Sequence, residues 1–188
     1  MPPSALAGNP PKWYTNPNTD NGGGSMVWTA ERGDAYALLA ALLAEQGISP
    51  LPPMARTQRG KPYFPGRPEV CFNLSHSHGW ALCAVSEKAV GCDIEVVRPR
   101  RPGLPRHVLS GAECAWFEER GSRWEDFFTL WTLKEARVKC TGEGLVLPAR
   151  DIAVPPITPG ETAELDGFTF TALEGGGWRG AVCQRERI

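Results

Sequence analysis

The sequence predicts an α+β protein in which small antiparallel sheets pack against a few helices. Short apolar segments recur between turns rich in Gly and Pro, a pattern typical of strands joined by tight connections. Two other segments begin with Ser-x-x-Glu, a signature of helix starts. The 188 residues are 41% hydrophobic and 22% charged, so the chain can build one substantial core or two small lobes that share one.

The first part of the chain combines a segment without pattern and one helix. Residues 1–25 are rich in Pro, Asn and Gly, so we expect a flexible arm or an added linker there. Residues 34–46 have the composition of a helix, with Asp34 placed to cap its start and Gly47 to end it. A Pro-rich connection follows.

Three apolar segments in the middle of the chain, at 69–75, 80–86 and 89–97, are strand candidates. They are joined by the short turns HSHG and EK. Turns this short join neighbouring antiparallel strands, so the sequence predicts a three-stranded meander.

Two helices and several short strands are expected in the rest of the chain. Ser110 with Glu113, and Ser122 with Glu125, each fit a capping box, in which the serine and the glutamate cap each other's backbone N–H groups. The helices should end near Gly121 and Gly142. The expected short strands lie at 150–154, 164–173 and 177–185.

Composition and charge argue against several classes of protein. The net charge of −1 gives no overall basic field for nucleic acid, and the longest apolar run, at 35–44, is too short to cross a bilayer. A secretion signal has a basic segment followed by an apolar one, and the N-terminus shows no such pattern. The six cysteines include no C-x-x-C pair, so we expect free, buried thiols in a cytoplasmic protein without membrane partners.

The stretch AVGCDIEVV, residues 89–97, is a strand candidate that carries two carboxylates. Side chains alternate along a strand, so Asp93 and Glu95 point the same way. Glu135 and Lys139 lie one helical turn apart in WTLKEARVK. Each pair alone fits a solvated surface, but together the three carboxylates make a hard-oxygen site of the kind that Mg²⁺ shares with phosphate.

FNLSHSHG, residues 72–79, places Ser75, His76 and Ser77 at the end of a strand. A Ser–His pair is found in hydrolases, but no G-x-S-x-G elbow surrounds this serine, which argues against a hydrolase. A metal site that uses His76 and His78 lacks further ligands at suitable spacing. A turn bonded to its own backbone and a set of donors to phosphate both remain open.

Four segments, in order, resemble the signature of the surfactin-type 4′-phosphopantetheinyl transferases. They are GKPYFP (60–65), FNLSHS (72–77), VGCDIE (90–95) and WTLKEARVKCTGEGL (131–145), and the resemblance covers roughly residues 56–150. It implies a single domain, residues 26–188, made of two similar lobes that are related by a pseudo-twofold. Each lobe would have a small antiparallel sheet packed on helices. The N-lobe would cover about 26–88 and the C-lobe about 89–188.

The resemblance also implies a role for each matching residue. Asp93, Glu95 and Glu135 match ligands of Mg²⁺, for which Mn²⁺ is an alternative. Lys139 matches the lysine at the reacting phosphate, and the catalytic set is Glu135, Lys139 and Asp93. The first helix contains no Lys or Arg, so residues that flank this helix would have to bind the 3′-phosphate of coenzyme A. The expected contacts to coenzyme A are Lys61, Ser75, His76, Lys134 and Lys139, with Arg56 and Arg59 at the 3′-phosphate.

The implied activity is transfer of 4′-phosphopantetheine from coenzyme A to a serine of an apo acyl, peptidyl or aryl carrier protein. Adenosine 3′,5′-bisphosphate is the by-product. In the trimeric half-size relatives, the acidic motif lies near the start of the chain. Here it lies in the middle of the chain, so we expect a monomer. Two alternatives are a Mg²⁺-dependent nucleotide phosphohydrolase and an inactive relative that binds coenzyme A.

Overall fold

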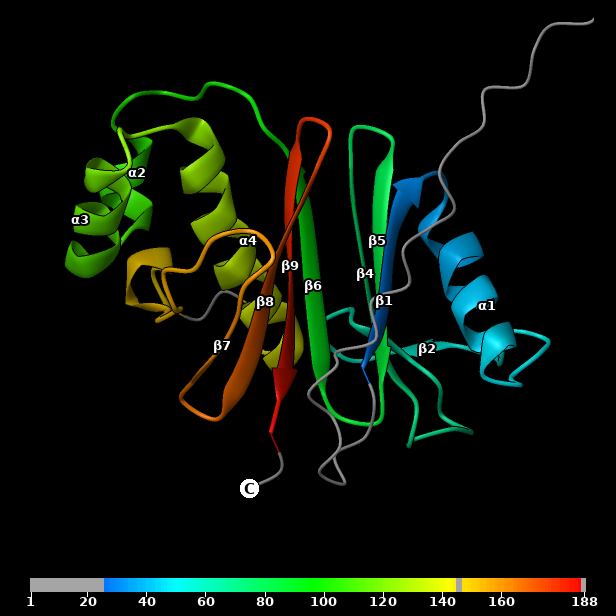
Figure 1. The fold of residues 1–188 in the computed structure, drawn as a ribbon. Helices are drawn as coiled ribbons and strands as arrows, with labels where there is room; N and C mark the ends of the chain where they lie inside the picture. Colours follow the sequence, from blue (N-terminus) through cyan, green and yellow to red (C-terminus); the bar gives the residue numbers. More distant parts are fainter. Residues whose placement is uncertain (1–25, 145–146, 187–188) are drawn as a thin grey trace, which may run out of the picture.

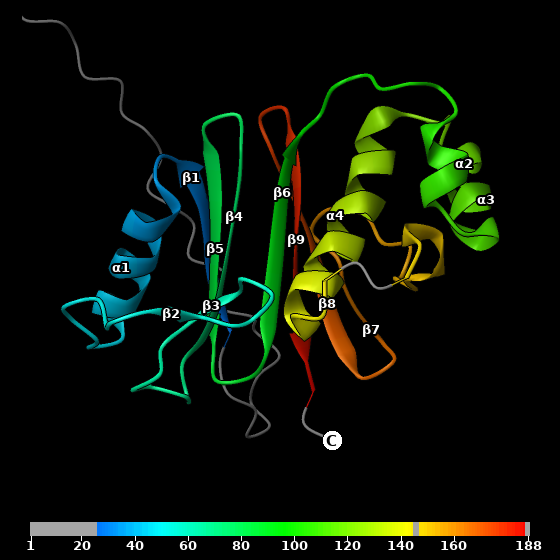
Figure 2. The same cartoon turned by 180° about the vertical axis from the view of Figure 1, so that it is seen from behind.

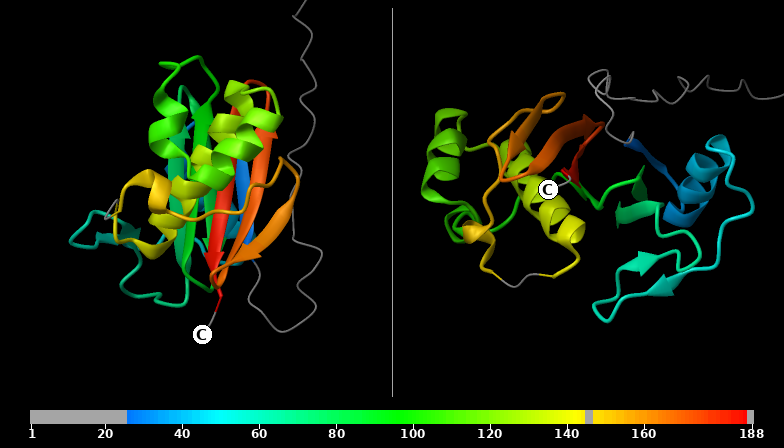
Figure 3. Two further views of the ribbon diagram at one scale, coloured as in Figure 1. Left: turned by 90° about the vertical axis from the view of Figure 1, so that its left-hand side faces the viewer. Right: turned by 90° about the horizontal axis from the view of Figure 1, so that it is seen from below.

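A computed structural model describes residues 26–144 and 147–186. The predicted arm, residues 1–25, lies outside the described residues. Two antiparallel sheets stand side by side at the centre, and helices cover their outer faces (Figure 1). The view from below shows α1 on one outer side and α4 on the other (Figure 3). The predicted α+β class, with small antiparallel sheets packed on helices, is confirmed.

The first sheet has the strand order β1-β5-β4. Its strands are β1 (Val27–Arg32), β4 (Cys71–Ser77) and β5 (Trp80–Ser86). Helix α1 (Ala35–Glu45) packs against this sheet through buried leucines that meet Phe64, Phe72 and Val85. The short strands β2 (Ala55–Arg56) and β3 (Pro62–Tyr63) form a separate ribbon.

The second sheet has the order β6-β9-β8-β7. Its strands are β6 (Val90–Val96), β7 (Thr162–Leu165), β8 (Phe168–Gly175) and β9 (Trp178–Arg185). The long helix α4 (Trp124–Thr141) lies against it, and α2 (Leu104–Val108) and α3 (Gly111–Glu119) lie further out (Figure 1). The 3₁₀ helix η1 (Ala149–Asp151) stands where a strand was expected, so that prediction was wrong.

The two sheets share a connectivity. In each, the first strand pairs with the last, the last pairs with the strand before it, and the intervening segment includes a helix that packs on the sheet. The predicted lobe boundary near residue 88 falls in the turn between β5 and β6, which passes from one sheet to the other.

The predicted meander was wrong at its third strand, because β6 pairs with β9 and not with β5. The other edge of β6 faces β4, where side chains replace a backbone ladder. The N–H groups of Cys92, Ile94 and Val96 donate to side-chain oxygens of Asn73, Ser75 and Ser77, at 2.8, 3.3 and 3.3 Å. The constant offset of 19 residues means that the two strands run parallel. Polar side chains on β4 therefore join the two sheets.

Gly91 lets α4 lie directly on β6. A Cβ atom at this position would collide with the carbonyl oxygen of Ala136 and the amide nitrogen of Cys140. The close approach places the same face of β6 that carries Asp93 under the C-terminal half of α4.

The helix starts follow the predicted caps at two of three positions. Asp34 accepts from the N–H groups of Tyr36 and Ala37, and Ser110 forms the full capping box with Glu113. The box at Ser122 was a wrong prediction, because Ser122 has a φ of 54° and the helix begins after Arg123. In its place, buried Asp126 in the first turn binds Arg120 and Arg123.

All six cysteines are free, as expected, but only four of them are buried, because Cys71 and Cys114 are partly exposed. Among residues 26–144 and 147–186, no helix is long and apolar enough to cross a membrane.

Candidate active site between β6 and α4

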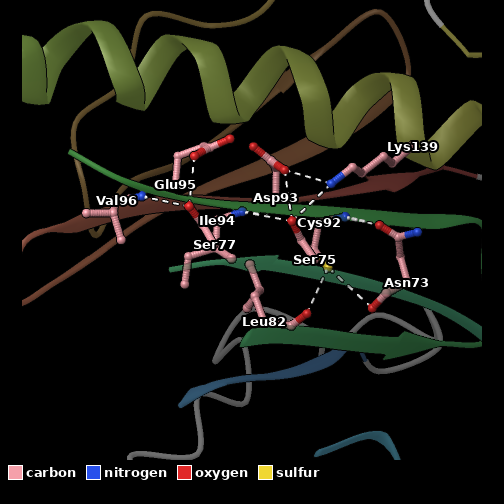
Figure 4. Close-up of polar contacts among 10 residues, drawn as sticks. All are labelled: Asn73, Ser75, Ser77, Leu82, Cys92, Asp93, Ile94, Glu95, Val96 and Lys139. Atoms are coloured by element: carbon pink, nitrogen blue, oxygen red, sulfur yellow. Dashed lines mark hydrogen bonds and ion pairs between the residues drawn. The ribbon is translucent and has the colours of Figure 1, made fainter. Parts of the chain in front are cut away.

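The two carboxylates of β6 lie on one face of the strand, beneath α4, as the alternation predicted (Figure 4). Asp93 is only 5% exposed. Its Oδ1 atom accepts from the ammonium of Lys139 at 2.7 Å and from the hydroxyl of Ser75 at 2.9 Å. The strand therefore buries a negative charge because α4 supplies a positive one.

Lys139 connects the helix to both strands of the site. Its ammonium also donates to the Ser75 hydroxyl at 3.0 Å. Burial alone would lower the pKa of Lys139, but the Asp93 carboxylate, with help from Glu135, holds this pKa above its ordinary value. The lysine is therefore charged at neutral pH.

Glu135 lies one turn before Lys139 on α4 and faces the same cluster of charges. Burial raises the pKa of the Glu135 carboxyl, Asp93 and Glu95 raise it further, and Lys139 opposes them. The charges of both β6 carboxylates therefore act on Glu135. A raised pKa suits a carboxylate that must take up a proton.

The donor set fits a hard divalent cation. Asp93 Oδ2 is a buried carboxylate oxygen with no hydrogen-bond partner among the described residues, so it retains a free lone pair beside two further carboxylates. Such oxygens are the ligands that Mg²⁺ prefers. Within the described part of the chain, no three acidic, His or Cys side chains already form a closed metal cluster. The ammonium of Lys139 forms an ion pair with Asp93 at this site.

Lys134 lies in a different environment from its neighbours in the motif. It is 1% exposed, and its ammonium lies 2.8 Å from the carboxylate of Glu113 and 2.6 Å from the carbonyl oxygen of Ile152. Burial lowers the pKa of Lys134, while Glu113 acts in the opposite direction. These contacts tie α4 to α3 and to the segment after η1, so they do not support the expected contact with coenzyme A.

Lys61 also has partners within the protein. The 55–68 excursion crosses from the first sheet to the C-terminal end of α4 (Figure 2). There the ammonium donates to the carbonyl oxygens of Val90 at 3.0 Å, Lys139 at 2.6 Å and Cys140 at 3.2 Å. An ammonium has three donors, and all three are used. These contacts show that Lys61 links the two lobes, and they do not support the expected contact with the adenosine end of coenzyme A.

The remaining candidates are distributed over the first lobe. His76 is exposed on β4, next to the buried Ser75. Arg56 is exposed and donates to the Gly60 carbonyl and the Tyr36 hydroxyl, and Arg59 is exposed in the turn between β2 and β3. Of the expected ligands of coenzyme A, only Ser75 and Lys139 are joined directly to the carboxylate cluster.

Sequence reasoning missed the role of Ser77. Its hydroxyl donates to Glu95 Oε2 at 2.9 Å, as the Ser75 hydroxyl does to Asp93. The signal was present, because Ser75 and Ser77 alternate along β4 with the same period as Asp93 and Glu95 along β6.

A groove of about 570 Å³ opens beside Glu95. Apolar side chains from α2 and α4 make one side of it, and two arginines of the β6–α2 connection make another. The lining comprises Glu95, Pro99, Arg100, Arg101, Leu104, Phe127, Phe128 and Trp131.

Comparisons with known proteins agree with the geometry. Residues 89–183, just over half of the chain, match the family model of the 4′-phosphopantetheinyl transferase superfamily. A 4′-phosphopantetheinyl transferase of Bacillus subtilis is 36% identical over 97 residues, which are 50% of this chain and 43% of that protein. Another, Sfp of Bacillus subtilis strain 168, is 33% identical over 97 residues with the same coverage.

A third relative, the 4′-phosphopantetheinyl transferase AcpT of Salmonella typhi, is 44% identical over 110 residues, 56% of this chain and 57% of that protein. The chain spans about half the length of the curated relatives it matches. The matched region begins just before β6 and includes β6 and α4, the elements that carry the carboxylates and Lys139, together with most of β9. The chain therefore belongs to the 4′-phosphopantetheinyl transferase superfamily.

Proposed function

We propose that this protein transfers 4′-phosphopantetheine from coenzyme A to a serine of an apo carrier protein in a Mg²⁺-dependent reaction. The observation that carries the proposal is the meeting of Asp93, Glu95, Glu135 and Lys139 between β6 and α4, within the region that matches the family. In the reaction, the serine oxygen bonds to the phosphorus that carries the pantetheine arm. The bond to adenosine 3′,5′-bisphosphate breaks, and the serine proton goes to a base.

Each residue of the site has a part in this chemistry. Asp93, Glu95 and Glu135 would hold Mg²⁺ (or Mn²⁺), which neutralises phosphate oxygens when it is bound. Lys139 donates to the reacting phosphate, where negative charge grows in the transition state. Glu135, with its raised pKa, is suited to accept the serine proton. Ser75, His76, Arg56 and Arg59 remain the proposed contacts to coenzyme A.

The groove beside Glu95 favours a protein as the acceptor. It begins at a carboxylate of the site, and its lining includes aromatic side chains together with Arg100 and Arg101. Aromatic and arginine side chains are enriched where proteins bind one another. A phosphohydrolase, whose acceptor is water, has no use for such a surface. Because both sheets that flank the site come from one chain, we propose that the protein acts as a monomer. We also propose that it acts in the cytoplasm.

The test is an incubation with coenzyme A, Mg²⁺ and an apo acyl carrier protein. The expected result is a mass gain of one phosphopantetheine on the carrier, which a carrier with its acceptor serine changed to alanine does not show. Cleavage of coenzyme A without any gain on the carrier would indicate the phosphohydrolase. Binding of coenzyme A without any reaction, across acyl, peptidyl and aryl carriers, would indicate the inactive relative.

A further inference from the structure

Ser77 is a buried hydroxyl with three polar neighbours. It is 7% exposed, and it donates to Glu95 Oε2 at 2.9 Å. The N–H of Val96 lies 3.3 Å from Ser77 Oγ, and Nδ1 of His78 lies 3.1 Å from it. The third neighbour decides where the single proton of the hydroxyl points.

The tautomer of His78 follows from its other nitrogen. Nε2 lies 3.1 Å from Nη1 of Arg98, and a guanidinium can only donate. Nε2 must therefore accept, so the proton of the neutral ring is on Nδ1 and is donated to Ser77. Both lone pairs of the Ser77 oxygen are then occupied, by Val96 and His78, and its proton has only the Glu95 carboxylate to bind.

Ser75, two residues earlier on β4, has a similar arrangement of contacts. Its hydroxyl donates to Asp93, accepts from the N–H of Ile94 and accepts from the ammonium of Lys139. Each of these two serines of β4 thus binds one carboxylate of β6 and the next N–H along (Figure 4). A third group fixes the proton of each serine. For Ser75 this third group is Lys139, and for Ser77 it is His78.

The backbone at His78 indicates that the ring is retained for its contacts. Its φ is 49°, in the left-handed region that glycine adopts more readily, and Gly79 follows with a φ of 81°. A glycine would suit this hairpin turn at least as well as a histidine. The imidazole, however, is what joins Arg98 to Ser77.

We propose that Ser77 is a positioning residue that orients the Glu95 carboxylate for a divalent cation, and that His78, held by Arg98, directs the Ser77 proton to Glu95. The inference rests on the proposed function, in which Glu95 is a ligand of that cation. Groups that orient metal ligands in this way typically change metal affinity by about 10–100-fold when they are removed.

The first experiment is a calorimetric titration of the whole protein with Mn²⁺ in the presence of coenzyme A. Ser77→Ala should weaken Mn²⁺ binding about tenfold or more. In assays of transfer, the Mg²⁺ concentration for half-maximal rate should rise by the same factor, with no change in KM for coenzyme A. The matched control is Ser86→Ala, which removes another buried strand hydroxyl, bound to Lys88 N–H and to Gln184, and should leave Mn²⁺ binding unchanged.

The second experiment separates the ring from the backbone. His78→Gly should leave the midpoint of thermal unfolding unchanged or higher and still weaken Mn²⁺ binding. His78→Asn should retain most of the binding, because an Asn amide can donate where Nδ1 does and tolerates a positive φ.

The outcomes for the two proposals differ. If wild type binds Mn²⁺ and Ser77→Ala binds it equally well, the positioning role is overturned and the proposed function stands. If only His78→Gly binds like wild type, the role of His78 is overturned. If wild type itself takes up no Mn²⁺, the cation site and the positioning role both fail.

Discussion

Lys61→Met should destabilise the protein without disturbing the reaction directly. The methionine retains most of the length of the side chain but removes the ammonium, which binds three carbonyl oxygens, two of them at the end of α4. The change therefore leaves the carbonyls of Val90, Lys139 and Cys140 without this donor. It also removes a cation from a helix C-terminus, where a positive charge is favourable.

The magnitude follows from these contacts. A hydrogen bond from a charged group contributes about 1.5–3 kcal/mol, and a cation at a helix end about 0.3–1 kcal/mol. Burial lowers the pKa of Lys61, so desolvation of the ammonium opposes these contributions. We therefore expect the free energy of unfolding to fall by about 2–3 kcal/mol and the Tm by about 5–10 °C.

Urea denaturation at pH 7 measures the change, with Arg67→Met as the control. Arg67 belongs to the same excursion, but it forms an exposed ion pair with Glu69 whose loss should cost only about 0–1 kcal/mol. At temperatures where Lys61→Met remains folded, KM for coenzyme A should stay near that of wild type. If Lys61→Met is as stable as the control and KM rises, the ammonium serves coenzyme A and not α4, and the reasoning is refuted.

Three further predictions concern the surroundings of the site. Glu113→Gln leaves the buried ammonium of Lys134 without its counter-charge, so urea denaturation should show a loss of about 3 kcal/mol or more, and a loss below 1 kcal/mol would contradict the buried pair. Gly91→Ala forces α4 away from β6, so soluble folded protein should be strongly reduced, and a wild-type circular dichroism spectrum and Tm would contradict the close packing. The pKa of Glu186 is lowered chiefly by its hydrogen bond from Lys88, so its contribution to stability is present above the unfolded-state pKa and is lost as pH falls through the folded-state value. Glu186→Gln should therefore lower the Tm at pH 7 but not at pH 3, and an equal loss at both values would refute the ion pair.

Local patterns in the sequence predicted much of the site because they depend on backbone geometry alone. The alternation along a strand placed Asp93 and Glu95 on one face, and the helical repeat placed Glu135 beside Lys139. The cap at Asp34 was predicted for the same reason, since a cap involves only neighbouring residues.

The environments of Lys61 and Lys134 could not be predicted in this way. Each ammonium finds its partners in segments far away in the sequence, at α4 for Lys61 and at Glu113 for Lys134. The motifs made both lysines resemble ligands of coenzyme A, whereas their burial is a property of the tertiary fold. The partner of β6 was missed similarly, because the short EK turn between the two predicted strands suggests a hairpin and the crossing to β9 has no local signal.

The central claim is that the cluster between β6 and α4 transfers phosphopantetheine, and the most direct measurement is the ratio of adenosine 3′,5′-bisphosphate released to carrier protein modified. Asp93→Asn is the matched variant, because it retains the shape of the side chain but removes the charge that faces Lys139. We predict that wild type releases one bisphosphate for each carrier modified, only with Mg²⁺ or Mn²⁺ present, and that Asp93→Asn loses both products together. Release of bisphosphate by wild type without a carrier, or full transfer by Asp93→Asn, would contradict the account.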